Sequence, residues 1–197
     1  RSDFMQMEKD RGISVSASAM SFDFENFRFN LVDTPGHSDF SEDTYRTLTA
    51  VDAAIMVIDG AKGVESQTRK LFEVCRLRDL PIFTFCNKMD RESRDVYDII
   101  DEIQDNLAID VTPVSWPIGV GQDFIGCYDL INDSLDLVDK ANRNLSVASI
   151  KIDGLNDPEL QKHVPKDFLK KLIEEVEMVK ELLPKLDKKS ILEGHLT

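Results

Sequence analysis

The consecutive residues Asp33-Thr34-Pro35-Gly36-His37 combine groups that can handle a phosphate. They follow an apolar stretch of strand length, so the Asp33 carboxylate is predicted to stand at a strand end, where it can hold Mg²⁺ directly or through water. Gly36 lets a backbone N–H approach a terminal phosphate with no side chain in the way. The imidazole of His37 could orient or polarise an attacking water molecule. The competing interpretation is an ordinary strand-to-helix turn with Asp33 as a helix cap.

A second polar turn, Asn87-Lys88-Met89-Asp90, follows another apolar stretch at 81–86. The Asp90 carboxylate can accept two hydrogen bonds from the N1–H and the exocyclic amine of guanine, a pair that adenine does not supply. Asn87 can brace the turn, and the aliphatic stem of Lys88 can lie against the purine ring. Taken alone, the segment is equally well explained as a polar loop.

The elements around these turns alternate between strand and helix. Residues 15–32 predict two strands joined by a turn at Glu25 and Asn26, and 38–49 predicts a short helix. Strands are then expected at 53–59 and 81–86, and amphipathic helices at 66–78 and 96–107. The two apolar strands are typical of strands covered on both faces. This alternation predicts an α/β fold with a doubly wound, mostly parallel sheet, whose ligands bind at the strand ends that carry both turns.

The pattern changes after residue 107. Short strand-like segments occur around 111–119, 124–130 and 146–152, and 167–183 predicts an amphipathic helix that ends before Pro184. We therefore predict a partial nucleotide-binding core at 1–107 and an appended α+β lobe at 108–197.

Composition limits the classes of partner. The 197 residues include 37 acidic and 24 basic side chains, for a formal net charge of −13, which argues against broad binding to nucleic acid and predicts no sequence-specific nucleic-acid contact. No apolar run approaches the roughly 20 residues needed to span a bilayer, and no signal-peptide pattern is present. We expect a soluble, cytoplasmic protein without a membrane contact. The three cysteines have no metal or redox spacing and are expected to be free thiols.

A third segment, Arg11-Gly12-Ile13-Ser14, precedes the first predicted strand. The hydroxyl of Ser14 on a loop could ligate Mg²⁺ and respond to a terminal phosphate. By itself the segment is better explained as a surface turn.

Together these segments make the chain resemble the GTPase domain of the translational GTPases, and most closely the bacterial class II peptide chain release factors. Arg11 to Ser14 is similar to the second motif of that family, Asp33 to His37 to the third, and Asn87 to Asp90 to the fourth. Ser14 stands where elongation factors usually carry Thr. Further stretches at 39–52, 68–71 and 116–130 also resemble the release-factor branch.

The resemblance implies a fold of the P-loop NTPase type, with GTP or GDP and Mg²⁺ as ligands. Asp33 and Ser14 would hold the metal, Gly36 would contact the terminal phosphate within the turn Asp33, Thr34, Pro35, Gly36, and His37 would be the catalytic residue that orients water. Asn87, Lys88, Met89 and Asp90 would select guanine. The implied role is GTP-dependent dissociation of class I release factors from the ribosome, which makes both of them expected partners.

Two family features are not found in the sequence. The phosphate-cradling loop Gly-x-x-x-x-Gly-Lys-Ser/Thr, with the first strand of the sheet before it, is expected upstream of Arg1, and the fifth motif is expected after Thr197. We therefore expect a piece of a larger factor that is not active by itself. The alternatives are a translocase similar to elongation factor G and a protein-interaction module derived from a decayed GTPase.

Overall fold

The computed structural model describes residues 17–36, 41–138 and 147–197. Its elements up to the end of the predicted core are β1 (Ser18–Phe24), β2 (Phe27–Asp33), α2 (Ser41–Thr47), β3 (Ala54–Asp59), α3 (Ser66–Arg76), β4 (Ile82–Asn87) and α4 (Val96–Leu107). The remaining elements are β5 (Ser115–Ile118), the short 3₁₀ helix η2 (Gly121–Asp123), β6 (Gly126–Asp129), β7 (Ser134–Val138), β8 (Val147–Lys151), α5 (Pro158–His163), α6 (Lys166–Leu182) and α7 (Lys188–Leu192).

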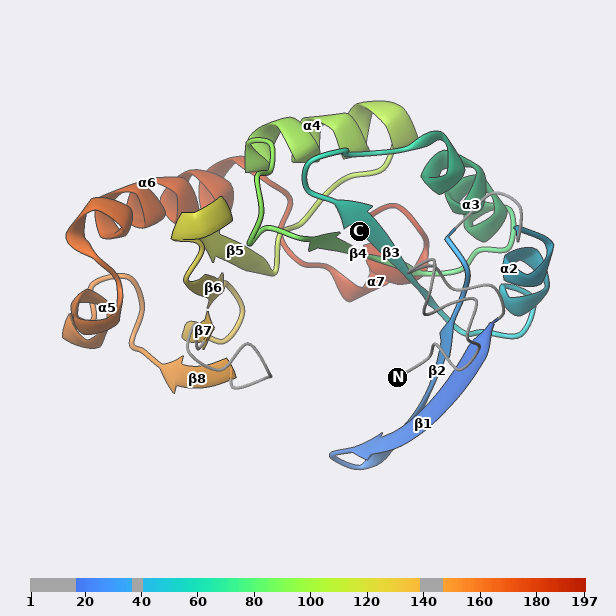
Figure 1. The fold of residues 1–197 in the computed structure, drawn as a ribbon, viewed down its shortest axis with the longest axis horizontal. Coiled ribbons are helices and arrows are strands. Elements are labelled where there is room, and N and C mark those ends of the chain that lie inside the picture. Colours follow the sequence, from blue (N-terminus) through green and yellow to red (C-terminus); the bar gives the residue numbers. More distant parts are fainter. Residues whose placement is uncertain (1–16, 37–40, 139–146) are drawn as a thin grey trace.

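Strands β1 and β2 form the predicted antiparallel hairpin, which extends away from the other elements as a two-stranded ribbon (Figure 1). Glu25 in the turn has a φ of 52°, in the left-handed region that tight turns require. Phe22 pairs with Phe29 in the register, and their rings stack with centroids 5.4 Å apart. One face of the ribbon carries a row of large apolar side chains, all of them exposed: Met20, Phe22, Phe24, Phe27, Phe29 and Leu31.

Strands β3 and β4 form a parallel pair that begins at Ala54 opposite Ile82 and ends at Asp59 opposite Asn87. Helices α3 and α4 pack on one face of this pair, where Ile58 and Ile82 join the buried core. The apolar side chains of the opposite face are exposed: Ile55, Val57, Phe83 and Phe85. The prediction that both strands are covered on both faces is therefore wrong, because successive side chains point to opposite faces and the described helices cover only one.

The parallel pair and the hairpin belong to different sheets. Since β2 and β3 are not hydrogen-bonded to each other, the described strands do not form one continuous sheet by themselves. The architecture is mixed α/β, with parallel pairing limited to β3 and β4 among the described residues.

The sheet β5-β6-β7-β8 is antiparallel and packs with α5 and α6 at the opposite end of the molecule from the hairpin (Figure 1). The predicted helix at 167–183 is confirmed as α6, which buries Leu172 and Val176, whereas β7, α5 and α7 were not predicted. Trp116 of β5 donates a hydrogen bond from Nε1 to Glu175 Oε2 of α6 at 2.9 Å. Tyr97 of α4 packs against Trp116 with ring centroids 5.2 Å apart, so this cluster joins α4 to the β5–β8 sheet.

The last residues of the chain return to β4. Asp110 N–H donates to the His195 carbonyl, and Thr197 N–H donates back to the Asp110 carbonyl. The Thr197 hydroxyl also donates to the carbonyl of Ile82 at 3.0 Å. Residues 195–197 thus lie beside the core strand, and the division into 1–107 and 108–197 stays a prediction.

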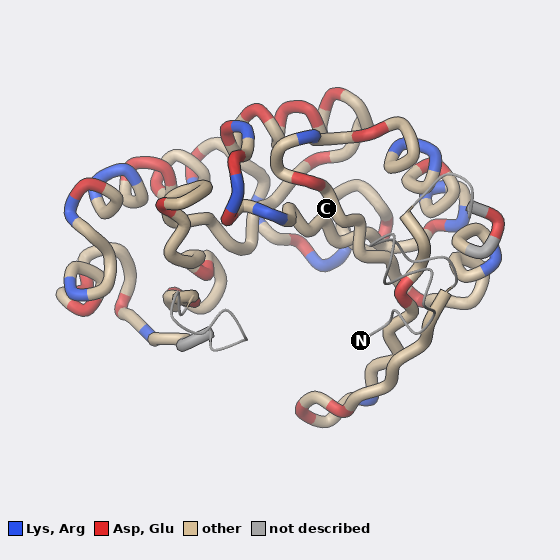
Figure 2. The backbone as a smooth tube through the Cα atoms, viewed as in Figure 1, with Lys and Arg blue, Asp and Glu red and all other residues tan. Residues whose placement is uncertain are grey.

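Acidic and basic residues are intermixed along α6, whereas the charged residues of α4 are all acidic and those of α3 are mainly basic (Figure 2). Within the described ranges, no helix is both long enough and apolar enough to cross a membrane. Cys75, Cys86 and Cys127 are free thiols, as predicted, and burial raises the pKa of each above its ordinary value.

Helix α4 ends at Leu107, and the cap residue that follows it, Ala108, has φ 49° and ψ 49°. A residue with a Cβ pays a steric penalty in this left-handed region that glycine does not. We expect Ala108→Gly to raise the free energy of unfolding by about 0.5–1 kcal/mol, measured by urea denaturation. Ala53→Gly, at an exposed position without a positive φ, is the matched control and should not stabilise; an equal gain in both variants would contradict the argument.

Candidate functional site

The phosphate-side turn follows β2 directly. Asp33 is the last residue of the strand and is half-buried, while Pro35 is buried and its carbonyl accepts a hydrogen bond from the Thr44 hydroxyl at 3.1 Å. This bond ties the turn to α2. Gly36 is exposed, and a Cβ placed there would meet no atom of the described residues within 4 Å, so these residues leave the space beside its backbone open to a ligand. The turn therefore offers one carboxylate and one unobstructed backbone segment.

Two of the predicted site residues, His37 and Ser14, lie outside the described residues. Their roles as the catalytic and the metal-binding side chain stay predictions.

The base-side turn follows β4 and has a defined internal structure. The Asn87 side-chain oxygen accepts a hydrogen bond from the Lys88 backbone N–H at 2.9 Å, which braces the turn. Lys88 has a φ of 66°, a left-handed conformation that reverses the chain direction. Met89 is buried, with its sulfur 3.5 Å from the Cys86 thiol. Three residues of the turn are thus held by the strand end beneath them.

Asp90 differs from its neighbours in this turn. Its side chain is exposed, and among the described residues no hydrogen bond or ion pair engages its carboxylate. A carboxylate at the rim of a braced turn keeps both oxygens available to accept hydrogen bonds from a ligand.

Lys88 is paired across the strand ends with Asp59. Its Nζ lies 2.7 Å from Asp59 Oδ2. The same carboxylate accepts from the backbone N–H of Ala61 at 3.0 Å and of Lys62 at 3.3 Å. The hydrogen bond from Lys88 and those from the backbone lower the pKa of Asp59 below its ordinary value, so the carboxylate is ionised at neutral pH.

The loop after β3 packs tightly under the base-side turn. Gly60 N–H donates to the Asn87 carbonyl at 2.9 Å, and a Cβ on Gly60 would lie 2.9 Å from Met89 Sδ and 3.3 Å from the Asn87 carbonyl oxygen. Arg94 and Glu102 form an ion pair beside the loop, and Glu102 also accepts a hydrogen bond from the backbone N–H of Val64. Only glycine fits at position 60 without displacing the turn.

The segment between β5 and β6 also contacts the base-side turn. Gly121, in the segment between β5 and β6, donates its N–H to the Met89 carbonyl at 2.8 Å. The base-side turn is therefore held between the loop after β3 and the loop before β6.

The structure does not bring the two predicted turns into direct contact: within the described ranges no hydrogen bond or ion pair joins Asp33–Gly36 to Asn87–Asp90. Sequence reasoning missed Asp59, Gly60 and Gly121. The signal for Asp59 was present, since it ends the strand before β4 and the carboxyl ends of neighbouring parallel strands meet at one edge.

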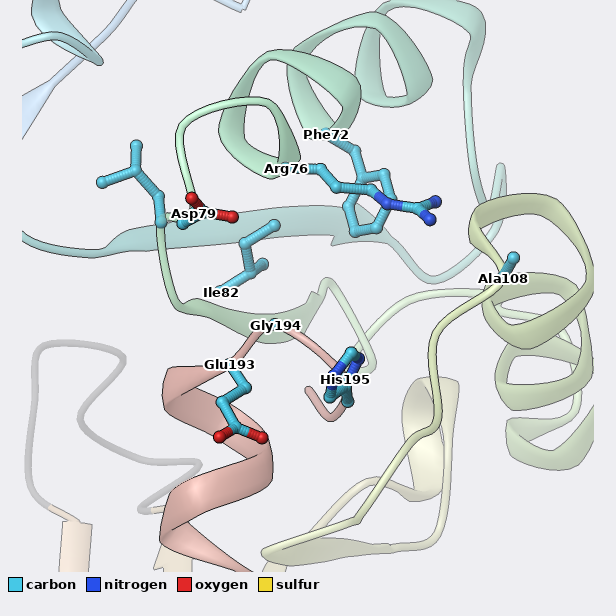
Figure 3. Close-up of a pocket in the computed structure, with 9 residues that line it drawn as sticks. Phe72, Arg76, Asp79, Ile82, Ala108, Glu193, Gly194 and His195 are labelled. Atoms are coloured by element: carbon cyan, nitrogen blue, oxygen red, sulfur yellow. The ribbon is translucent and has the colours of Figure 1, made fainter.

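A cavity of about 230 Å³ lies elsewhere, at the amino-terminal end of β4 (Figure 3). It is lined by Phe72, Arg76, Asp79, Leu80, Ile82, Ala108, Glu193, Gly194 and His195. Because Ile82 begins β4 and Asn87 ends it, this cavity lies at the opposite end of β4 from the base-side turn.

Comparisons with known proteins agree on one family. The family model described as "Elongation factor Tu GTP binding domain" matches residues 1–189. Proteins named "Peptide chain release factor 3" are 48% identical in Microcystis aeruginosa, 47% in Rippkaea orientalis and 46% in Gloeothece citriformis, each over 196 residues. Each alignment covers 100% of this chain and 36% of the relative, so the chain spans about a third of their length.

A crystal structure of a protein from Thermus thermophilus has a similar fold. Its TM-score is 0.71 at 20% sequence identity, over 99% of this chain and 30% of that one. At this identity the likeness supports the mixed α/β fold alone.

The packing at Gly60 generates a stability prediction. Gly60→Ala should lower the free energy of unfolding by about 1–3 kcal/mol, because the added methyl forces Met89 and the Asn87 carbonyl away. Gly36→Ala, whose methyl meets no atom of the described residues, should change the free energy of unfolding by less than about 0.5 kcal/mol. Urea denaturation of both variants measures the two free energies of unfolding. Equal values would show that the close packing around Gly60 does not contribute to stability.

Proposed function

The chain belongs to the elongation factor Tu GTP-binding domain family, and from this membership we propose that the protein binds and hydrolyses GTP during translation termination. The observation that carries the proposal is the whole-chain likeness to three proteins named "Peptide chain release factor 3", at 46–48% identity. Those names favour a release factor over the alternative translocase similar to elongation factor G. The chain spans 36% of these relatives, which is why the activity and partners of the whole protein are proposed.

The base-side turn is the guanine-recognising part of this proposal. The Asp90 carboxylate, exposed and unengaged among the described residues, accepts from the N1–H and the exocyclic amine of guanine. Asn87 braces the turn through its bond to the Lys88 N–H at 2.9 Å. The aliphatic stem of Lys88 covers the purine ring, and Met89 anchors the turn in the core.

The phosphate-side turn is the proposed metal and phosphate end. A single half-buried carboxylate at a strand end suits Mg²⁺, which is usually held by one or two protein oxygens together with substrate phosphates. Asp33 and Ser14 would hold the ion, and the segment Thr34-Pro35-Gly36 would present backbone to the terminal phosphate. When bound, Mg²⁺ neutralises charge on the phosphates. His37 orients the attacking water.

The partners follow from the same proposal. The protein would act on the ribosome in the cytoplasm and promote dissociation of class I release factors. Residues 1–107 would supply the nucleotide-binding core and 108–197 the appended lobe, whose Gly121 contacts the base-side turn.

The guanine assignment predicts a change of base specificity. In Asp90→Asn of the full-length protein, the side-chain amide N–H₂ faces the exocyclic amine of guanine, so we expect GDP affinity to fall by roughly one to two orders of magnitude. Xanthosine diphosphate carries an oxygen at that ring position and should bind the variant better than GDP. Glu92→Gln removes a nearby exposed charge and is the matched control. Unchanged GDP affinity in Asp90→Asn would refute the assignment.

The role proposed for His37 predicts a separation of binding from hydrolysis. His37→Ala should reduce ribosome-stimulated GTP hydrolysis by about 10²–10⁴-fold while GTP affinity changes little, because the imidazole acts on water rather than on the bound nucleotide. Single-turnover hydrolysis and fluorescent-nucleotide titration measure the two quantities. His163→Ala, in α5, is the control for loss of a histidine. Parallel losses of affinity and rate in His37→Ala would count against the role.

A further inference from the structure

We infer that Asp59 is a positioning residue for the nucleotide site: it holds the ammonium group of Lys88 so that the lysine stem is oriented before a purine arrives. The inference rests on the proposed guanine-nucleotide function and adds a residue from a different strand to it. Its value to binding is that the side-chain freedom of Lys88 is restricted in advance rather than when the ligand binds.

The contact itself is short and partly shielded. Lys88 Nζ lies 2.7 Å from Asp59 Oδ2, and the Asp59 side chain is 16% exposed against 45% for Lys88. A charge-assisted hydrogen bond at this distance, with one partner mostly withdrawn from water, is stronger than a pair between two mobile surface side chains.

Asp59 is itself immobilised, which a positioning role requires. Oδ1 accepts from the N–H groups of Ala61 and Lys62, while Oδ2 is left for Lys88. The Asp59 carbonyl also accepts from Gly63 N–H at 2.8 Å, closing the loop behind the carboxylate. The bonds to Oδ1 therefore fix the orientation of the carboxylate, and Oδ2 accepts the hydrogen bond from the Lys88 ammonium group.

The strand register brings the two residues together. Asp59 and Asn87 are partners at the ends of parallel β3 and β4, so the residue after Asn87 leaves the sheet beside Asp59. The left-handed backbone at Lys88 and the bond from Gly60 N–H to the Asn87 carbonyl then turn the lysine back across the strand ends. The arrangement orients one side chain of the base-side turn and leaves Asp90 free.

The alternative is that the pair contributes only to stability. A stabilising pair would lower the thermal midpoint when broken and leave nucleotide affinity unchanged. If the pair positions Lys88, breaking it at Asp59 would lower nucleotide affinity only through Lys88. The effect of the Asp59 substitution would then disappear in a variant whose residue 88 cannot pair with Asp59. These two outcomes are separated by a double-mutant cycle.

The experiment uses the full-length protein and fluorescent GDP. Asp59→Asn keeps an oxygen acceptor for the turn and loses the charge; we expect its GDP affinity to fall by about tenfold with little change in thermal midpoint. Asp59→Asn in a Lys88→Met background should cause no further loss. Lys88→Arg, which can still pair with Asp59, should lose less affinity than Lys88→Met. Glu65→Gln is the control: it breaks the ion pair between Lys62 Nζ and Glu65 Oε2, 3.7 Å apart in the same loop region. This variant should bind GDP as the wild type does.

Each other outcome overturns the inference. Losses that multiply in the double variant would mean that Asp59 acts independently of Lys88, and a lower thermal midpoint with unchanged affinity would mean that the pair is only structural. If the wild type binds GDP and Asp90→Asn weakens it while Asp59→Asn does not, the inference fails and the proposed function stands. If the wild type does not bind GDP, both fail.

Discussion

The parallel register of β3 and β4 is the constraint on which the rest of the candidate site depends. Because Asp59 and Asn87 are partners, both strands end at the same level, and the loop after one strand must pass under the turn after the other. Gly60 makes that passage possible, since any side chain there would enter the space of Met89 and the Asn87 carbonyl. The ion pair between Asp59 and Lys88 is a consequence of the same register.

Two carboxylates at this edge have different surroundings and hence different uses. Asp59 is bound by backbone N–H groups and by Lys88, so its charge is satisfied within the protein. Asp90 lies exposed at the rim, and the described residues leave it without a hydrogen bond. In the proposed guanine site, one carboxylate would organise the turn and the other would accept hydrogen bonds from the ligand.

Sequence predicted the parts of the fold that depend on local pattern. The hairpin turn at Glu25 and Asn26, the periodic helices α3, α4 and α6, and the placement of Asp33 and Asn87 at strand ends are all present. Coverage of the sheet was predicted wrongly, because an apolar run such as 53–59 does not reveal how many helices pack against each face. Ile55 and Val57 are 60% and 56% exposed as a result. The position of Asp59 at a strand end could be predicted from pattern, but its pairing with Lys88 depends on the register of β3 and β4. The contact of Gly121 could not be predicted, because it comes from a loop distant in the sequence. The roles of His37 and Ser14 rest on resemblance.

The aromatic ribbon formed by β1 and β2 has a consequence for the behaviour of the chain in solution. Phe22, Phe24, Phe27 and Phe29 lie on one face of a two-stranded sheet and are 44–68% exposed, with Ile55 and Phe85 exposed on the parallel pair. Flat, water-facing aromatic surfaces next to unpaired strand edges promote self-association. The net charge of −13 opposes it through mutual repulsion. Added salt weakens the repulsion between the negatively charged chains and leaves the apolar attraction in place. The tendency of the chain to self-associate should therefore increase with salt concentration.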